Sequence, residues 1–342
     1  MSLPPSGEIP QGAIRFNTDS QRLEFYAQDQ WWVMSTDTPN LGRNVDSTPS
    51  ARGIFLGGND GDPAATPRID YINIASTGDA TTFGDMSTAR GGLNSGSLSS
   101  STRGIRVGGD PTTNEIRFVT IASTGDEQTF GTLDSSRRQM SSVSNQTRGV
   151  FGGGTPTNRD ELEFITIAST GSSNAFGDLS KIRDGAAGLS SPTRGIFAMG
   201  GTPANPNFNE TSSDYITIAT TGDAIDFGDM TVARHVVAGL SNATRGLCGG
   251  GLEPGSVNVI DYITIATLGN GTDFGDLTEA KRSVNGCASP TRGVFAGGDS
   301  GGTRKIEIEY VEIATEGNSV DFGDLTLARM EHTSFSNAHG GL

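Results

Sequence analysis

Arginine is the residue type in this 342-residue sequence that is best suited to specific polar chemistry. The basic residues comprise 21 arginines and only 3 lysines, and the planar guanidinium group binds carboxylates and phosphates in a fixed geometry. Seven arginines precede short stretches of small residues at similar spacing: Arg43, Arg90, Arg138, Arg183, Arg234, Arg282 and Arg329. A ring of these side chains could hold an anion such as an acidic sugar. The alternative, which we favour for residues that recur in every repeat, is structural ion pairing with Asp85, Asp178, Asp229, Asp276 and Asp324.

The sequence contains no recognisable arrangement of catalytic or metal-binding residues. The three histidines, His235, His332 and His339, all follow or end the same kind of segment, and none has a serine, cysteine or aspartate partner in a recognisable motif. Two cysteines, Cys248 and Cys287, show neither metal-ligand nor disulfide-framework spacing. The acidic segment 59–62 lacks the ligand spacing of a calcium-binding EF-hand loop. We therefore predict no catalytic residue, no metal site, no cofactor and no enzymatic activity.

The elements that position these residues come from an internal repeat. The segment TRGVFAGG at 291–298 has five relatives, which begin at residues 51, 102, 147, 193 and 244. Each copy is followed by a segment like YITIAT (262–267), and then by one like DFGDL (273–277). Alternating β-branched and aromatic residues indicate strands, and the Gly-Asp and Gly-Asn pairs indicate turns. The stretch of small residues after each arginine adds one more strand. Every unit of about 48 residues therefore holds four strands, as a β-propeller blade does.

The order of these segments resembles the kelch repeat of β-propellers. Phenylalanines stand where kelch repeats usually have a tryptophan in the fourth strand: Phe83, Phe130, Phe176, Phe227, Phe274 and Phe322. We expect these rings, and the aromatic residue of each third strand, to form the core between blades. The consensus is also similar to repeats in structural proteins of marine and cyanobacterial phages. This resemblance implies a virion protein that is part of a tail fibre or baseplate.

The number of blades depends on how the two ends of the repeat array are interpreted. We predict an all-β, seven-bladed propeller in which N-terminal strands in 12–36 pair with a C-terminal strand in 329–340. Residues 1–11 then form a tail, and 12–342 form the propeller. The blades cover about 43–88, 90–136, 138–181, 183–232, 234–280, 282–327, and 329–342 with 12–36. The alternative is six blades and a separate hairpin module at 12–36, a segment that also resembles short N-terminal parts of phage tail fibres.

The loops between second and third strands are the best candidates for recognition. They differ in length and sequence while the segments around them repeat, and variable loops on a rigid scaffold often bind partners. The longest, at 202–213, offers amides and an aromatic ring that suit a sugar: Asn205, Asn207, Phe208 and Asn209. Unconstrained drift of the loop sequence would look the same.

Composition narrows the choice of partners. The net charge is −15, so a nucleic-acid partner is not expected. No apolar run is long enough to insert into a membrane, and the first residues do not resemble a secretory signal. We predict a non-enzymatic virion protein that contacts other virion proteins and a host-surface glycan, and that could form a homo-oligomer. The alternative is an architectural virion protein, such as a capsid decoration or a tail joint, without receptor binding.

Overall fold

The computed structural model describes residues 9–10, 12–17, 22–28, 30–33, 51–61, 65–92, 96–156, 159–202 and 208–342. The chain divides into two compact units, Met1–Ser50 and Ala51–Leu342. Within the described ranges every regular element is a β-strand. The prediction of an all-β protein is therefore confirmed.

The first unit contains a three-stranded antiparallel sheet in the order β1 (Ile14–Asn17), β2 (Arg22–Ala27) and β3 (Gln30–Val33). Arg15 pairs with Glu24 at 2.7 Å and lies over the ring of Trp31, 4.1 Å from its centroid. Tyr26 is buried and meets Trp31 edge-on. These contacts give this small sheet one packed face.

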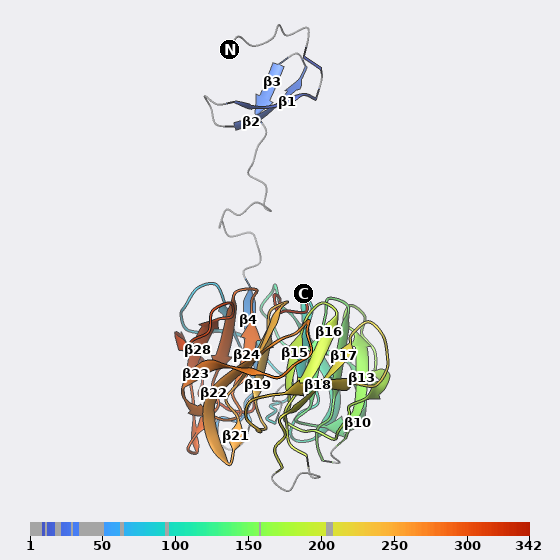
Figure 1. The fold of residues 1–342 in the computed structure, drawn as a ribbon, viewed down its shortest axis with the longest axis vertical. Helices are drawn as coiled ribbons and strands as arrows, with labels where there is room; N and C mark the ends of the chain where they lie inside the picture. The colour runs from blue at the N-terminus through green and yellow to red at the C-terminus, as the bar shows by residue number, and fades with distance from the viewer. Residues whose placement is uncertain are drawn as a thin grey trace. The chain divides into compact units, whose positions relative to one another are not determined.

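The second unit consists of six four-stranded antiparallel sheets (Figure 1). Sheet 1 contains β30 (Thr333–Ser336), β4 (Arg52–Leu56), β5 (Arg68–Asn73) and β6 (Thr81–Asp85). Sheet 2 contains β7 (Ser97–Ser99), β8 (Arg103–Val107), β9 (Thr113–Thr120) and β10 (Gln128–Arg137). Sheet 3 contains β11 (Ser141–Ser144), β12 (Arg148–Gly152), β13 (Glu161–Thr166) and β14 (Asn174–Asp178).

The remaining three sheets repeat this order. Sheet 4 contains β15 (Ala187–Ser190), β16 (Arg194–Ala198), β17 (Ser212–Thr217) and β18 (Ile225–Asp229). Sheet 5 contains β19 (Ala238–Ser241), β20 (Arg245–Gly249), β22 (Gly255–Thr264) and β23 (Thr272–Lys281), with β21 (Leu252–Glu253) paired to β22. Sheet 6 contains β24 (Asn285–Ala288), β25 (Arg292–Ala296), β28 (Glu307–Glu312) and β29 (Val320–Asp324), besides the hairpin β26 (Asp299–Ser300) and β27 (Thr303–Arg304).

The core lies between neighbouring sheets. The second strand of each sheet is buried except at its first arginine, whereas the fourth strand is typically buried only at its phenylalanine and exposed elsewhere. In every sheet that phenylalanine meets the third-strand aromatic edge-on, as Tyr71 meets Phe83 at 6.0 Å. The expectation of an aromatic core is confirmed for the fourth-strand phenylalanines, which are all buried, whereas the third-strand aromatics other than Phe118 are half-buried and pack against that core.

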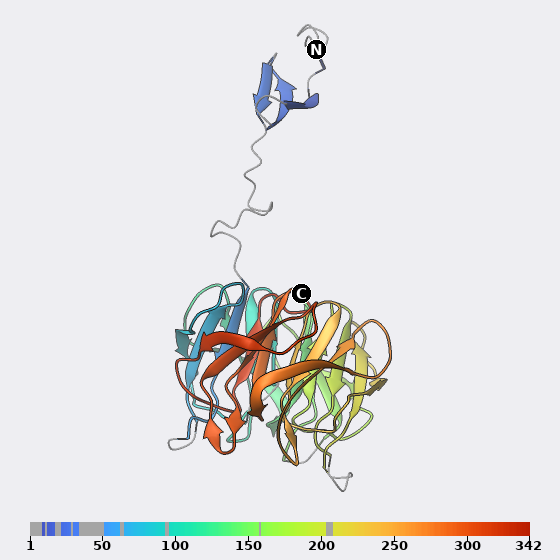
Figure 2. The same ribbon diagram turned by 60° about the vertical axis from the view of Figure 1, so that its left-hand side comes forward.

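The first strands of the six sheets contact one another in a closed circle, in the order β7, β11, β15, β19, β24, β30 and back to β7. We call these six the inner strands. Hydrogen bonds cross from one to the next: Ser142 Oγ donates to Ser97 O at 2.7 Å, and Ser97 Oγ donates to Ser334 O at 2.7 Å. Figures 1 and 2 show the sheets of the second unit packed side by side, and the closed circle of inner strands is consistent with propeller blades.

The predicted seventh blade is wrong. The C-terminal strand β30 pairs with β4, with Thr333 opposite Leu56 and Ser336 opposite Gly53, and not with residues 12–17. β1 pairs with β2, and β2 with β3. The reason lies in the sequence of the inner strands. Thr-Ser-Phe-Ser at 333–336 matches Ser-Ser-Val-Ser at 141–144, the inner strand of sheet 3. β30 is therefore the inner strand of sheet 1 and pairs with its second strand, β4. The six-sheet alternative is the one that the pairing supports.

Glycine allows the outer parts of the sheets to approach closely. Gly84 of β6 lies so near the carbonyl oxygen of Gly125 in sheet 2 that a Cβ would collide with it, and Gly125 N–H donates to Phe83 O at 2.9 Å. The same contact joins sheet 6 to sheet 1, where Gly78 N–H donates to Phe322 O at 2.8 Å. All six sheet-to-sheet junctions therefore use one geometry, including the junction that closes the circle.

Candidate functional site

A buried ion pair links consecutive sheets. Arg329 Nη2 lies 2.7 Å from Asp70 Oδ2, and both side chains are completely buried. Asp70 also accepts a hydrogen bond at 2.7 Å from the hydroxyl of Thr326, which follows the fourth strand of sheet 6. Burial lowers the pKa of Arg329 to about 10, so this guanidinium is still charged at neutral pH. The carboxylate thus joins the third strand of one sheet to the preceding sheet.

Four other junctions have the same pair, formed by the cation before the inner strand and the acid of the third strand. The pairs are Arg137 with Glu163, Arg183 with Asp214 (3.2 Å), Arg234 with Asp261 (2.7 Å) and Lys281 with Glu309 (2.6 Å). In each of them a group at the end of the preceding sheet donates to the acid, as Ser180 does to Asp214. We call these five pairs, including Arg329 with Asp70, the junction pairs.

The expected partners of the arginines were wrong. These five aspartates are exposed or half-buried; four of them, Asp85, Asp178, Asp229 and Asp324, end the fourth strands, and Asp276 lies within β23. Their backbone N–H groups donate to Asp or Asn side chains in the turns of the next sheet, as Asp324 N–H does to Asp79 at 3.0 Å. The acids that pair with the buried cations lie in the third strands instead.

The seven arginines of the predicted ring do not share one environment. Arg183, Arg234 and Arg329 are buried in junction pairs. Arg138 and Arg282 come one residue after the buried cation of their sheets and pair with Asp110 (2.9 Å) and Asp299 (3.2 Å). Arg90 belongs to the different junction of sheet 2, which is described next. Arg43 lies outside the described residues.

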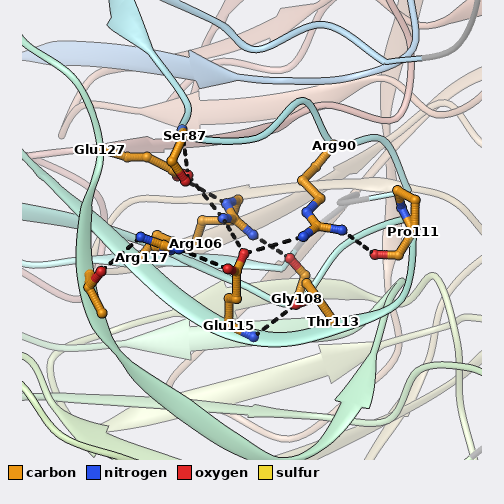
Figure 3. Close-up of polar contacts among 10 residues, drawn as sticks. Ser87, Arg90, Arg106, Gly108, Pro111, Thr113, Glu115, Arg117 and Glu127 are labelled. Atoms are coloured by element: carbon orange, nitrogen blue, oxygen red, sulfur yellow. Dashed lines mark hydrogen bonds and ion pairs between the residues drawn. The ribbon is translucent and has the colours of Figure 1, made fainter.

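Sheet 2 has a different junction (Figure 3). Arg106 on β8 occupies the position of Phe55 in sheet 1, and it pairs with Glu127 at 3.2 Å, both side chains being fully buried. Glu127 accepts hydrogen bonds from the backbone and hydroxyl of Ser87. Arg117 stands in the place of the third-strand acid, so a buried pair is retained, but its cation lies on the second strand and its acid directly before the fourth strand.

This arrangement displaces Arg90. Because Arg117 stands at the position of Asp70, Arg90 contacts Glu115, two residues earlier on β9, at 3.4 Å and donates to the carbonyl of Pro111 at 2.6 Å (Figure 3). Glu115 also pairs with Arg117 at 2.8 Å, and although burial opposes ionisation, the nearby arginines lower its pKa. All these groups have partners within the sheet or its neighbours, so they form a structural network.

A second set of arginines begins the second strands: Arg52, Arg103, Arg148, Arg194, Arg245 and Arg292. Each lies over the third-strand aromatic of its own sheet, as Arg148 does over Phe164 at 4.4 Å. Each also donates to backbone carbonyls of the next sheet; Arg148 Nη1 reaches Ile218 O at 3.1 Å and Ala219 O at 2.7 Å. These side chains therefore act as clamps between sheets.

The inner strands enclose a small hydroxyl-lined cavity. Its lining includes the serine that ends each inner strand except β24, where Ala288 takes this place. The cavity volume is about 60 Å³, which leaves room for a few water molecules. His339 lies at this cavity, with Nε2 3.1 Å from Ser99 O and 3.3 Å from Ser144 Oγ. Each of these serines also donates to a backbone carbonyl of a neighbouring inner strand.

The four predicted sugar-binding residues are only partly described. Asn205 and Asn207 lie outside the described residues. Phe208 meets His235 edge-on at 5.0 Å, and Asn209 is buried, with Oδ1 2.6 Å from His235 Nδ1 and Nδ2 3.1 Å from Glu253 Oε2. The end of the longest loop is therefore anchored on sheet 5, next to β21 at the end of the sheets opposite the C-terminus (Figure 1).

The thiols and acidic groups of the described residues form no reactive cluster. Burial raises the pKa of Cys248 to about 12 and also raises that of Cys287, so both thiols stay protonated. Burial also lowers the pKa of His235. Within the described ranges no group of three His, Cys, Asp or Glu side chains is arranged to hold a metal ion.

The chain matches no protein-family model and no curated protein. In the described part of the chain, no helix is present that could cross a membrane.

Proposed function

We propose that the second unit is a kelch-like, six-bladed β-propeller of a bacteriophage virion. In this proposal the protein is a non-enzymatic component of a tail fibre or baseplate and presents its loops to a glycan on the host surface. The virion assignment rests on the resemblance of the repeat to phage structural proteins. The propeller assignment is supported by the six sheets and their closed circle of inner strands.

One observation carries the proposal: the recurring polar residues are used inside the molecule, whereas the loops are not repeated. The junction pairs and clamp arginines bind protein groups in neighbouring sheets. The loops between second and third strands lie at one end of the sheets and differ from sheet to sheet. Sequence freedom on a rigid scaffold is the usual setting of a recognition surface.

The test replaces residues 203–207 by a Gly-Ser turn of equal length and leaves Phe208 and Asn209 in place to anchor the loop. A matched control replaces Thr220 and Thr221 by Gly-Ser in a turn of the same sheet at the opposite end, and keeps Gly222 and Asp223, which bind sheet 3. We expect both variants to melt like the wild type, and only the first to lose binding to host cells and to glycan arrays. Retained binding by the loop variant would exclude this loop as the recognition site.

A second candidate is an architectural virion role without receptor binding. It is favoured by Ile14 and Phe16, which share one face of β1 and are 62 % and 58 % exposed. Alternate residues of a strand point to the same face, so the two form one apolar surface that another virion protein or a second copy could cover. Cross-linking from position 14 in assembled particles would identify that partner, and glycan arrays without any binding would favour this role.

A further inference from the structure

Residues 330–342 close the circle of sheets without a covalent bond. Within this segment β30 lies between two inner strands: Ser334 Oγ donates to Gly286 O of β24 at 2.8 Å, and Ser97 Oγ of β7 donates to Ser334 O. The chain then crosses the end of the cavity, where Gly340 N–H donates to Ser241 O of β19 at 2.8 Å. We call residues 330–342 the closing segment.

Glycine makes this crossing close. A Cβ on Gly340 would collide with the carbonyl oxygens of Ser190 and Asn242, and one on Gly341 with that of Ser144. The closing segment therefore touches inner strands on both sides of the cavity. Losing it would remove one inner strand and the contacts that join the others.

His339 is held in its neutral form by its hydrogen bonds. Nε2 faces the carbonyl of Ser99, which can only accept, and Nδ1 accepts the N–H of Gly341 at 3.0 Å. A protonated ring would direct a second N–H at the N–H of Gly341. The groups that face this ring from β7 and β11 are serines, with no carboxylate to compensate a charge among the residues described there. Burial lowers the pKa of His339 to about 4.

His332 occupies a core position. Apolar residues stand at the equivalent place before four of the five other inner strands, Met140, Ala186, Val237 and Val284, and Gly96 stands before β7. His332 is completely buried, lies edge-on against Phe55 of β4 at 6.0 Å, and has no hydrogen-bond partner for either ring nitrogen among the described residues. The charged groups near it are Arg329, which precedes the closing segment, and Asp70 of β5, which pairs with Arg329. Burial, reinforced by Arg329, lowers its pKa well below the usual value.

We propose that the closing segment is an acid-sensitive latch, which protonation of His332 and His339 releases from the inner strands. This inference does not depend on the proposed function. Both histidines are neutral when the segment is bound, and both regain a pKa near 6.5 when it is released. The released state therefore binds protons that the closed state excludes, so the latch is at full strength above about pH 6.5 and weakens as the pH falls towards 4.

The size of the effect follows from His339 alone. A pKa that falls from 6.5 to about 4 corresponds to roughly a 300-fold change in the ratio of closed to open latch at low pH, tenfold for each unit. At pH 4.5, relative to pH 7.5, we expect the closing segment to open roughly 70-fold more often by the same relation. Protonation of His332 adds to this.

The test measures hydrogen exchange of peptides from 330–342 in the full chain at pH 7.5 and pH 4.5, corrected for the intrinsic pH dependence of exchange. Peptides that cover β11 are the internal reference. The double variant His332→Val, His339→Gln removes both titrating groups; valine stands at the equivalent position in sheet 5, and glutamine can donate to Ser99 and accept from Gly341. His235→Gln is the control, because His235 lies outside the closing segment, before β19, and contacts Asn209 and Phe208.

The wild type and His235→Gln are expected to lose protection of 330–342 selectively at pH 4.5, and the double variant is expected to keep it. Should the double variant not fold, each single variant is expected to show a smaller acid response than the wild type. The proposal is overturned if the wild-type segment stays as protected as β11 at pH 4.5, or if the variants open as readily as the wild type.

Discussion

The junction before sheet 1 and the junction before sheet 2 bury the same charges with different residues. Before sheet 1, Arg329 precedes the inner strand and pairs with Asp70 on the third strand, while Thr326 of the preceding sheet donates to Asp70. Before sheet 2, Arg106 on the second strand pairs with Glu127 beside the fourth strand, and Ser87 takes the role of Thr326.

This difference shows which property the repeat maintains. A cation and an anion are buried together, and a group of the preceding sheet donates to the anion; the strand that carries each charge can change. A buried pair adds little net stability compared with apolar residues, but a single buried charge without its partner is costly. The pair therefore has to be exchanged as a unit, which accounts for three coordinated differences in sheet 2: Arg106, Arg117 and Glu127.

The largest expected effect comes from breaking a junction pair on one side. Arg329→Met should destabilise the second unit by about 3–5 kcal/mol, because Asp70 stays buried without its cation. Chemical denaturation measures this change. The double variant Arg329→Met, Asp70→Leu should recover more than half of the loss. A double variant that is no more stable than the single one would contradict the claim that the cost comes from the unpaired charge.

The junction before sheet 2 can be converted by mutation into the arrangement found before sheet 1. Arg106→Phe alone should cost about 3 kcal/mol, because it leaves Glu127 buried without a partner. The triple variant Arg106→Phe, Arg117→Asp, Glu127→Ala recreates the sheet 1 arrangement and gives Arg90 a carboxylate at position 117, the place of Asp70. Its unfolding free energy should lie closer to that of the wild type than to that of the single variant. Further loss in the triple variant would mean that the rest of sheet 2 has adapted to the exchange.

Removing the charge of an unpaired buried acid should raise the stability, whereas breaking a junction pair lowers it. Burial raises the pKa of Asp184 to about 6, although Arg138 opposes the shift. The folded state thus favours the protonated acid, so stability falls as the pH rises from about 4 to about 6, and the full penalty remains above pH 6. Asp184→Asn should stabilise the protein by about 1–2 kcal/mol at pH 7.5, and this gain should vanish towards pH 4. Equal gains at both pH values would exclude ionisation of Asp184 as the cause.

The clamps should give the smallest effects. Arg148→Lys should cost about 1 kcal/mol, because lysine cannot both lie flat over Phe164 and donate to two carbonyls. Arg194→Lys is the matched case, since Arg194 donates to the single carbonyl of Ile265, and it should cost less. The unfolding free energies of the two variants test this order directly.

Much of the fold could be predicted from the repeat, because each strand type carries its own pattern of apolar, aromatic and glycine residues. The partner of the last strand could not. The spacing from Arg329 to Gly340 equals that from Arg282 to Gly293 and so suggested a further second strand, but residues 337–342 cross the cavity instead. The better signal was the serine that ends 333–336, which 141–144 and 238–241 share.

The roles of the arginines were harder to predict than their recurrence. Recurrence correctly favoured structural ion pairs, but proximity in the sequence pointed to the wrong acids. The correct signal was a charged residue inside an otherwise apolar third strand, as at Asp70 and Asp261. The buried cations Arg137 and Lys281 were missed, since the alignment of the repeats selected the arginine that follows each of them, Arg138 and Arg282. The pairing of Arg106 with Glu127 depends on contacts between strands, which a single sequence does not show.

The measurement that tests the account most directly is the thermal unfolding of residues 51–342 alone, beside the full chain. If β30 closes six sheets on β4, the shortened protein should fold and melt at the same temperature as the second unit of the full chain. If residues 12–36 instead complete the circle, their removal exposes the edges of neighbouring strands. A shortened protein that melts far earlier or aggregates, while the full chain stays folded, would contradict the six-sheet closure.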